Sequence, residues 1–245
     1  MKVINKVTVT GADDSVDINK MFEIQEKYPF VEWGILLSEK YSLGDGAGRF
    51  PSKKWLQELI NSNSISRTKL NLSGHICGKW VTKTLLGEFP CLETIHGNFP
   101  DYFTRFQLNT HAELHKVDFD KLDLVLKKLR SNVQSVIFQL DGVNDIMVPM
   151  WKRNHRNISG LFDLSHGAGI LPSAWPKPIE GMYCGYAGGL SPDNVIEQLE
   201  KIVIANGDDK ETWIDAETLL RSPDNRTFDL DKVVQFLENS KKYVI

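Results

Sequence analysis

The sequence has few cysteines, which argues against a disulfide framework. Its 245 residues contain three of them, Cys77, Cys91 and Cys184, an odd number at wide spacings. Disulfide-rich folds and zinc sites use cysteines in even sets or at short, paired spacings. We therefore expect free thiols in a reducing compartment and a cytoplasmic protein, with no bound metal and no cofactor.

Long apolar runs and basic clusters are also missing. The N-terminal MKVINKVTVTGADD lacks a signal-peptide core, and no run approaches the roughly 18 apolar residues of a membrane span. Nucleic acids and acidic membranes need a concentrated basic face, whereas the net charge is −3. We expect a small-molecule substrate as the partner, no nucleic acid, no membrane, and a monomer or homodimer.

What the chain does contain is a regular alternation of short β-rich runs and amphipathic helical stretches. The runs are KVTVT (6–10), VEWGILLS (31–38), KLNLSGH (69–75), RFQLN (105–109), SVIFQLD (135–141), SGLFDLS (159–165), MYCGYA (182–187) and TWIDAE (212–217). Such alternation predicts a parallel sheet with helices outside it, and eight units suit a closed barrel. We predict an α/β protein, a (β/α)8 TIM barrel, with residues 1–245 forming a single domain.

The helical stretches carry recognisable start signals. Five of them open on residues whose side chains cap helices well, namely Asp17, Ser52, Asp118, Ser191 and Asp229. The fifth and sixth intervals, 144–154 and 173–180, are interrupted by proline and predict poor helices.

Alternation within each strand predicts which side chains point into the barrel. Apolar side chains that meet the outer helices leave the opposite set facing inward. The last inward position is polar on seven strands: Thr10, Ser38, His75, Asn109, Asp141, Asp163 and Glu217. Gln139 and Asp215 also face inward near this end, while Glu32 and Arg105 lie deeper and predict a buried ion pair.

These polar positions fall at the C-terminal mouth, where barrels gather function. Each buried polar group left unpaired would cost about 1–3 kcal/mol, and this cost favours a ligand site in which a bound molecule pairs these groups. Mutual hydrogen bonding without a ligand is the alternative. A second feature is GYAGGLSPDNV (185–195), where Gly188 and Gly189 precede a helix. Backbone N–H groups there suit an anion, and a plain tight turn is the alternative.

Several segments together resemble phosphoribosylanthranilate isomerase, a (β/α)8 enzyme of tryptophan synthesis. They are KVTVTGADDSVD (6–17), GRFPSKKWLQEL (48–59), GLFDLSHGAG (160–169), AGGLSPDNV (187–195) and WIDAETLLRSPDNRTFDLDKVVQFLENSK (213–241). The match of AGGLSPDNV to the family's Gly-Gly-Leu-x-Pro-Glu-Asn-Val is the closest, and the motifs keep their order along most of the chain.

The resemblance implies an Amadori rearrangement, in which a cysteine base and an aspartate acid move protons across an aminoaldose. The aspartate falls on Asp163 and the substrate-binding arginine on Arg49, but the cysteine falls on Thr10. A threonine hydroxyl does not ionise near neutral pH. The family's phosphate falls at Gly188 and Gly189, whose partner loop here carries Glu217. A carboxylate about 4 Å from a phosphate costs about 4 kcal/mol at an effective dielectric near 20.

We therefore expect a related enzyme that moves protons by acid/base catalysis on a polar sugar- or carboxylate-bearing metabolite, in a reaction other than the isomerase's. Asp163 would be the acid/base, with His75 or Asp13 as its partner. The residues expected to bind substrate are Thr10, Arg49, Asn109, Gln139, Asp141, Asp215 and Glu217, and those expected to bind phosphate are Gly188 and Gly189. The alternative is a non-catalytic metabolite-binding barrel that has lost the base.

Other interpretations rank lower. A divalent metal held by Asp163, Asp215, Glu217 and His75 has no ligand-spacing motif to support it. His96, His111 and His115 are expected on the surface or in loops, while His166 can reach the mouth. The Gly-rich loop 39–52 is expected to be mobile and to cover part of the mouth, with Arg49 reaching inward.

Overall fold

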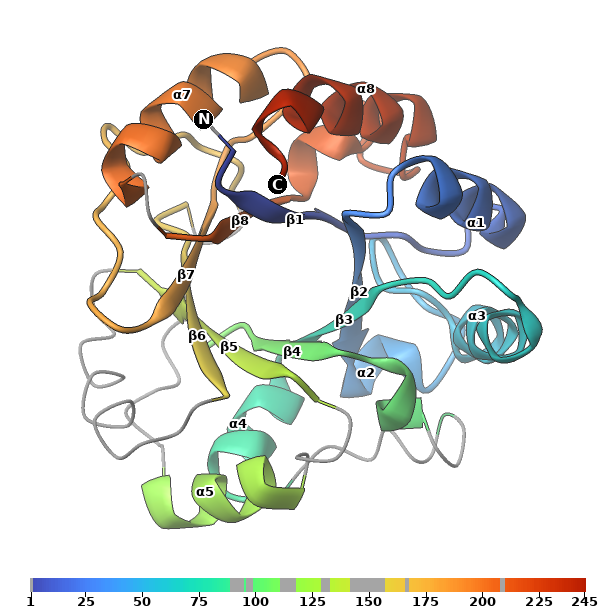
Figure 1. Ribbon diagram of the computed structural model, residues 1–245. Coiled ribbons are helices and arrows are strands. Elements are labelled where there is room, and N and C mark those ends of the chain that lie inside the picture. The colour runs from blue at the N-terminus through green and yellow to red at the C-terminus, as the bar shows by residue number, and fades with distance from the viewer. Residues whose placement is uncertain are drawn as a thin grey trace.

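Eight parallel strands close into a barrel in sequence order, β1 to β8, with the helices outside it (Figure 1). The computed structural model describes residues 2–88, 95, 99–110, 118–128, 133–141, 157–165, 168–207 and 210–245. The strands are β1 (Ile4–Thr10), β2 (Val31–Ser38), β3 (Leu72–Cys77), β4 (Arg105–Leu108), β5 (Ser135–Leu140), β6 (Ile158–Phe162), β7 (Tyr183–Ala187) and β8 (Thr212–Ala216). Each overlaps a predicted run, and the predicted (β/α)8 fold is confirmed.

The helices lie in the intervals between the predicted runs and after the last one. They are α1 (Ile18–Lys27), α2 (Glu39–Ser42), α3 (Lys53–Ile65), α4 (Lys79–Leu85), α5 (Phe119–Lys128), α7 (Val195–Asn206) and α8 (Leu230–Ser240). Short 3-10 turns are η2 (Phe99–Tyr102), η5 (Thr218–Leu220) and η6 (Lys241–Tyr243). Within the described ranges, no helix is both long and apolar enough to cross a membrane.

Four of the five predicted caps are confirmed by side-chain bonds. The side chains of Asp17, Ser52, Asp118 and Asp229 each accept from a backbone N–H in the first turn of their helix. Ser191 differs, because α7 begins later, at Val195, after a turn over 191–194. That turn is closed by Asn194, whose Oδ1 accepts from the Ser191 N–H at 2.9 Å.

Of the two proline-interrupted intervals, one lies within the described residues. Interval 173–180 is described and contains no helix, as its prolines predicted. Interval 144–154 lies outside the described residues. The short helix α2, at the start of the loop that follows β2, was not predicted.

The barrel interior is divided into an apolar and a polar part. Ile137, Leu161, Ala187 and Trp213, from β5 to β8, form a small inner apolar cluster. Buried polar side chains occupy much of the interior along β1 to β4, among them Thr8, Glu32, His75 and Arg105. On the outer side of β1, Val7 and Val9 are fully buried against the helices. Polar groups therefore fill the part of a barrel that branched apolar residues normally occupy.

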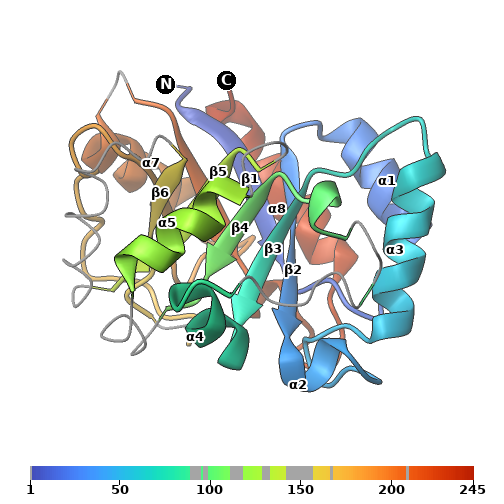
Figure 2. The same cartoon turned by 90° about the horizontal axis from the view of Figure 1, so that it is seen from below.

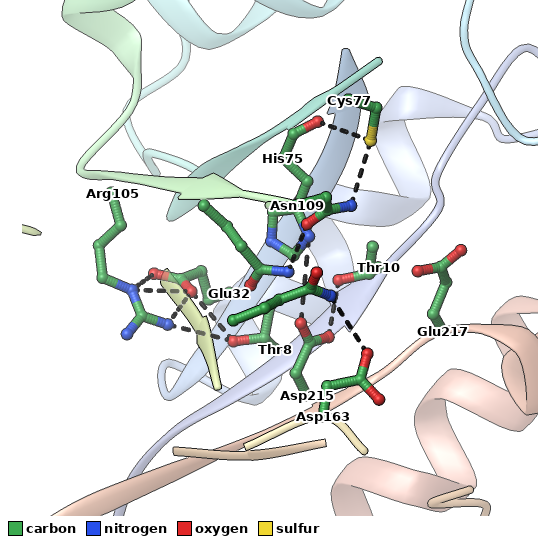
Figure 3. A network of polar contacts seen from close by, with 12 residues as sticks. Thr8, Thr10, Glu32, His75, Cys77, Arg105, Asn109, Asp163, Asp215 and Glu217 are labelled. Carbon is green, nitrogen blue, oxygen red and sulfur yellow. Dashed lines mark hydrogen bonds and ion pairs between the residues drawn. The ribbon is translucent and has the colours of Figure 1, made fainter. Parts of the chain in front are cut away.

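The predicted ion pair between Glu32 and Arg105 is confirmed inside the barrel (Figure 3). Arg105 Nε donates to Glu32 Oε1 at 2.9 Å, and Thr8 Oγ1 donates to Glu32 Oε2 at 3.0 Å. The guanidinium also lies over the Trp213 ring, 4.6 Å from its centre. Burial opposes the charge on Glu32, but Arg105 outweighs it and holds the pKa of Glu32 below its ordinary value.

Candidate functional site

A cleft opens at the C-terminal ends of the strands, the end of the barrel opposite to both chain termini (Figure 2). Side chains of β4, β5, β6 and β8 line it together with the loops that follow β2, β6, β7 and β8. Eight predicted site residues are among those lining it: Arg49, Asn109, Gln139, Asp163, Gly188, Gly189, Asp215 and Glu217. The structure therefore brings most of the predicted set together around one hollow.

Asp215, on β8, is a carboxyl group at the inner end of the cleft. It is 6% exposed, and its Oδ1 accepts from Thr10 Oγ1 at 2.7 Å. Burial raises the pKa of Asp215 well above its ordinary value; the nearby carboxylates of Glu217 and Asp163 add to the effect, and the Thr10 hydrogen bond opposes it. Such a setting favours the protonated form of a carboxyl group, the form that can act as an acid.

Thr10 and His75 fit beside Asp215 because the neighbouring position on β2 is a glycine. A methyl group on Gly34 would lie 2.1 Å from Thr10 Oγ1 and 3.0 Å from His75 Cε1. Any larger side chain at this inward position would push both groups out of place. The two residues are fully buried, at 0% and 1% exposure, and neither is among the residues that line the cleft.

Asp163 stands directly after β6 and has a different setting from Asp215. Its Oδ1 accepts from the Ser165 N–H at 3.1 Å and from Ser165 Oγ at 2.7 Å. Its Oδ2 accepts from Gln139 Nε2 at 3.2 Å. Both oxygens therefore accept hydrogen bonds, Oδ1 from two donors and Oδ2 from one, and this arrangement suits the carboxylate form, which can only accept.

Glu217, just after β8, is paired with Arg49 at the rim. Burial and the Asp163 carboxylate raise the pKa of Glu217, and Arg49 and Arg221 oppose this rise. Arg49 comes from the loop that follows β2, which the Tyr41–Phe50 ring stack at 5.0 Å holds in shape. The loop thus places Arg49 at the mouth, as expected, while its mobility stays a prediction.

His75 does not have the setting expected of an acid/base histidine. Burial, with a smaller contribution from Arg105, lowers the pKa of its imidazole to about 3. The ring is therefore neutral at neutral pH, and its Nδ1 lies 4.0 Å from Asp215 Oδ2. The desolvation that lowers this pKa comes from the packed barrel interior. Strand parity predicts which way a side chain points but not how deeply it is buried.

Asp13 and Asp141 are not among the residues that line the cleft. Asp13 Oδ2 accepts from Arg221 Nη2 at 2.7 Å, and its Oδ1 accepts from the Ser15 N–H at 2.9 Å. This ion pair fixes the loop after β1 to the segment after η5, a structural arrangement that does not favour Asp13 as a catalytic partner. Asp141 is buried at the end of β5.

Within the described part of the chain, no three His, Cys, Asp or Glu side chains are grouped to hold a metal ion. The alternative in which Asp163, Asp215, Glu217 and His75 share one metal is therefore not supported. His96, His111, His115 and His166 lie outside the described residues.

Cys77 is a mouth residue that the sequence reasoning missed. β3 runs two residues further than predicted, so Cys77 continues the inward series of Ser73 and His75. Asn109 Nδ2 lies 3.1 Å from its Sγ. Burial, together with the Glu217 carboxylate, raises the pKa of the Cys77 thiol to about 12, so it stays protonated at neutral pH. Extending the strand parity by two residues would have found it.

The glycine turn after β7 has a steric explanation. Gly188 and Gly189 have φ of +109° and +67°, which side chains rarely adopt. A methyl group on Gly189 would also lie 2.4 Å from the Leu171 nitrogen. The turn therefore needs glycine to let the loop that follows β6 pass over it, and its use as an anion site stays a prediction.

No protein-family model matches the chain, and no curated protein matches it. Among solved structures, it resembles a monomeric form of the dimeric phosphoribosylanthranilate isomerase from Thermotoga maritima, with 14% identity and a TM-score of 0.53 over 96% of this chain and 98% of that one. It also resembles phospho-2-dehydro-3-deoxyheptonate aldolase from Thermotoga maritima, with 9% identity and a TM-score of 0.52 over 98% of this chain and 69% of that one. At these identities the likeness shows the fold.

Proposed function

We propose that this chain is an enzyme that transfers protons on a small polar metabolite carrying a sugar or carboxylate group, bound at the C-terminal mouth of the barrel. The reaction differs from that of phosphoribosylanthranilate isomerase, because Thr10 stands where the resemblance places the cysteine base and its hydroxyl is bonded to Asp215. Asp215 takes the partner role that the sequence analysis gave to His75 or Asp13.

The observation that carries this proposal is the contrast between two carboxyl groups in one cleft. Asp215 is buried with a raised pKa, whereas Asp163 accepts three hydrogen bonds. Pairs of titratable groups with contrasting environments divide acid and base roles between them. Asp163 would take a proton from a carbon next to a carbonyl or imine, and Asp215 would give one to its oxygen or nitrogen. Asp163 then returns its proton to the former carbonyl or imine carbon, while Asp215 takes back a proton from the hydroxyl or amino group on the first carbon; this completes an isomerisation and restores both carboxyl groups.

Deuterium exchange tests this even while the product is unidentified. A panel of aldoses, ketoses, amino sugars and sugar acids is incubated with the protein in D2O, and solvent deuterium at substrate carbons is followed by NMR. We expect exchange for at least one class of compound. Asp163→Asn and Asp215→Asn should each slow it by about 10²–10⁴-fold, the usual contribution of a positioned acid or base.

The matched control is Asp101→Asn. Asp101 is exposed and lies in η2, which precedes β4 at the opposite end of the barrel, so this variant should exchange at the wild-type rate. Exchange that persists in Asp163→Asn would contradict the assignment. Saturable binding without any exchange would favour the non-catalytic metabolite-binding barrel, which the non-ionisable Thr10 also suits.

A further inference from the structure

The ion pair between Arg49 and Glu217 lies at the rim of the cleft. An entering ligand therefore contacts this pair before it reaches the inner carboxyl group of Asp215. From this pair we infer that Glu217 determines specificity: it occupies Arg49 and so bars phosphate and carboxylate groups, leaving uncharged or cationic polyhydroxylated ligands as the substrate class. The inference rests on the proposed function in taking this cleft as the substrate site, and it narrows that proposal.

The balance of charge around the cleft is the first support. Among the described residues that line it, Arg49 is the only cationic side chain, while Asp163, Asp215 and Glu217 carry carboxyl groups. Among these described residues an anionic ligand therefore has one candidate cation, and that cation is already paired with Glu217. To bind, the ligand must displace a carboxylate that is fixed on the chain and sits at the same rim.

An anion bound at the glycine turn would also lie close to these carboxylates. A methyl group on Gly188 would lie 3.5 Å from Asp163 Oδ1, so the Asp163 carboxylate lies close beside the turn. Glu217 lines the same cleft. A phosphate seated on the backbone N–H groups there would face two carboxylates, and like charges at such contacts cost several kcal/mol and exclude wrong partners.

The remaining polar groups favour a ligand that donates hydrogen bonds. Carboxylate oxygens accept, and the Oε1 of Gln107, a cleft residue only 4% exposed, has no hydrogen-bond partner within the described structure. Hydroxyl and ammonium groups are donors, whereas phosphate and carboxylate groups bring only more acceptors. The lining therefore complements a neutral or aminated sugar-like molecule.

Sulfate binding by isothermal titration calorimetry tests the role of Glu217. Sulfate stays dianionic at neutral pH and cannot react, so it reports the anion site alone. We expect Glu217→Gln to bind sulfate at least about tenfold more tightly than the wild type, a change of about 1.4 kcal/mol, because Arg49 is released. The double variant Glu217→Gln/Arg49→Gln should return to the wild-type affinity.

Glu211→Gln is the matched control, since Glu211 is exposed and immediately precedes the same strand, β8, at its other end. It should bind sulfate as the wild type does. Equal sulfate affinity in Glu217→Gln and the wild type would overturn the inference, and so would gained affinity that survives the loss of Arg49. Because binding is measured, absence of deuterium exchange would count against the proposed function and leave this result standing.

Discussion

Two carboxyl groups inside the barrel, Glu32 and Asp215, have pKa values shifted in opposite directions. Glu32 is fully buried beside Arg105, which holds its pKa below the ordinary value. Asp215 is buried beside other carboxyls, and its pKa is raised. Both carboxyl groups are buried, so burial alone does not decide the protonation state; the presence of a cation does.

Glu32 lies in the ion-paired interior of the barrel, whereas Asp215 lines the cleft that we propose as the active site. Among the described residues, the guanidinium deep inside the barrel, Arg105, pairs with Glu32, and the one that lines the cleft, Arg49, pairs with Glu217. Asp215 has no such cation among the described residues, and its Oδ1 accepts a hydrogen bond from the Thr10 hydroxyl. Uncompensated burial costs stability, and such cost is typical of sites that keep a titratable group for chemistry.

The largest effect should come from breaking the compensated region. Arg105→Met leaves Glu32 buried without its cation, and we expect a loss of about 3–5 kcal/mol in the free energy of unfolding. Urea denaturation followed by circular dichroism measures this loss. In Arg105→Met/Glu32→Gln much of the loss should be recovered, because no buried charge remains; a double variant no more stable than the single would contradict this explanation.

A smaller effect should follow from crowding the layer beside Asp215. Gly34→Ala places a methyl group 2.1 Å from Thr10 Oγ1, and overpacking of this kind typically costs about 1–3 kcal/mol. The Thr10–Asp215 hydrogen bond should be lost with it. Thermal unfolding gives the cost, and Gly34→Ala/Thr10→Ala, which removes the clashing hydroxyl, should recover part of it.

Asp215→Asn should make the protein more stable at neutral pH while slowing deuterium exchange by about 10²–10⁴-fold. A carboxyl whose pKa is raised on folding contributes stability below its unfolded pKa, about 3.9, and loses it as pH rises through the folded value. Asparagine cannot ionise and still accepts from Thr10.

Melting temperatures from pH 3.5 to 8 test this sign. The variant should gain on the wild type as pH rises, and the two should converge below about pH 4; each kcal/mol corresponds to about 2–4 °C for a chain of this size. A wild type that gains on the variant with rising pH would show that Asp215 is ionised and compensated after all.

The smallest effect on stability should come from the rim. The Arg49 side chain is 34% exposed, and exposed ion pairs contribute about 0–1 kcal/mol, so Arg49→Ala should barely change the melting temperature. It should nevertheless raise the pKa of Glu217 further, since Arg49 is the group that lowers this pKa most. NMR titration of the Glu217 carboxyl, with Lys40→Ala as a control on the same loop, reads this shift.

Much of the fold was accessible from the sequence because its signals are local. Strand alternation has a period of two, so Val7 and Val9 facing outward already place Thr8 and Thr10 inside. The same rule placed Glu32 and Arg105 on the inner face although 73 residues separate them. The predicted run 69–75 ended before Cys77, because strand ends depend on neighbouring strands and loops more than on propensity.

What the amino-acid sequence determined by itself is which side chains enter the barrel and at which end they gather. Only the tertiary structure decided what those groups can do: Arg49 meets Glu217 across 168 positions, and Arg221 meets Asp13 across 208. The physical reason is that desolvation and Coulomb energy depend on every atom packed around a group, and segments far apart in the chain supply those atoms.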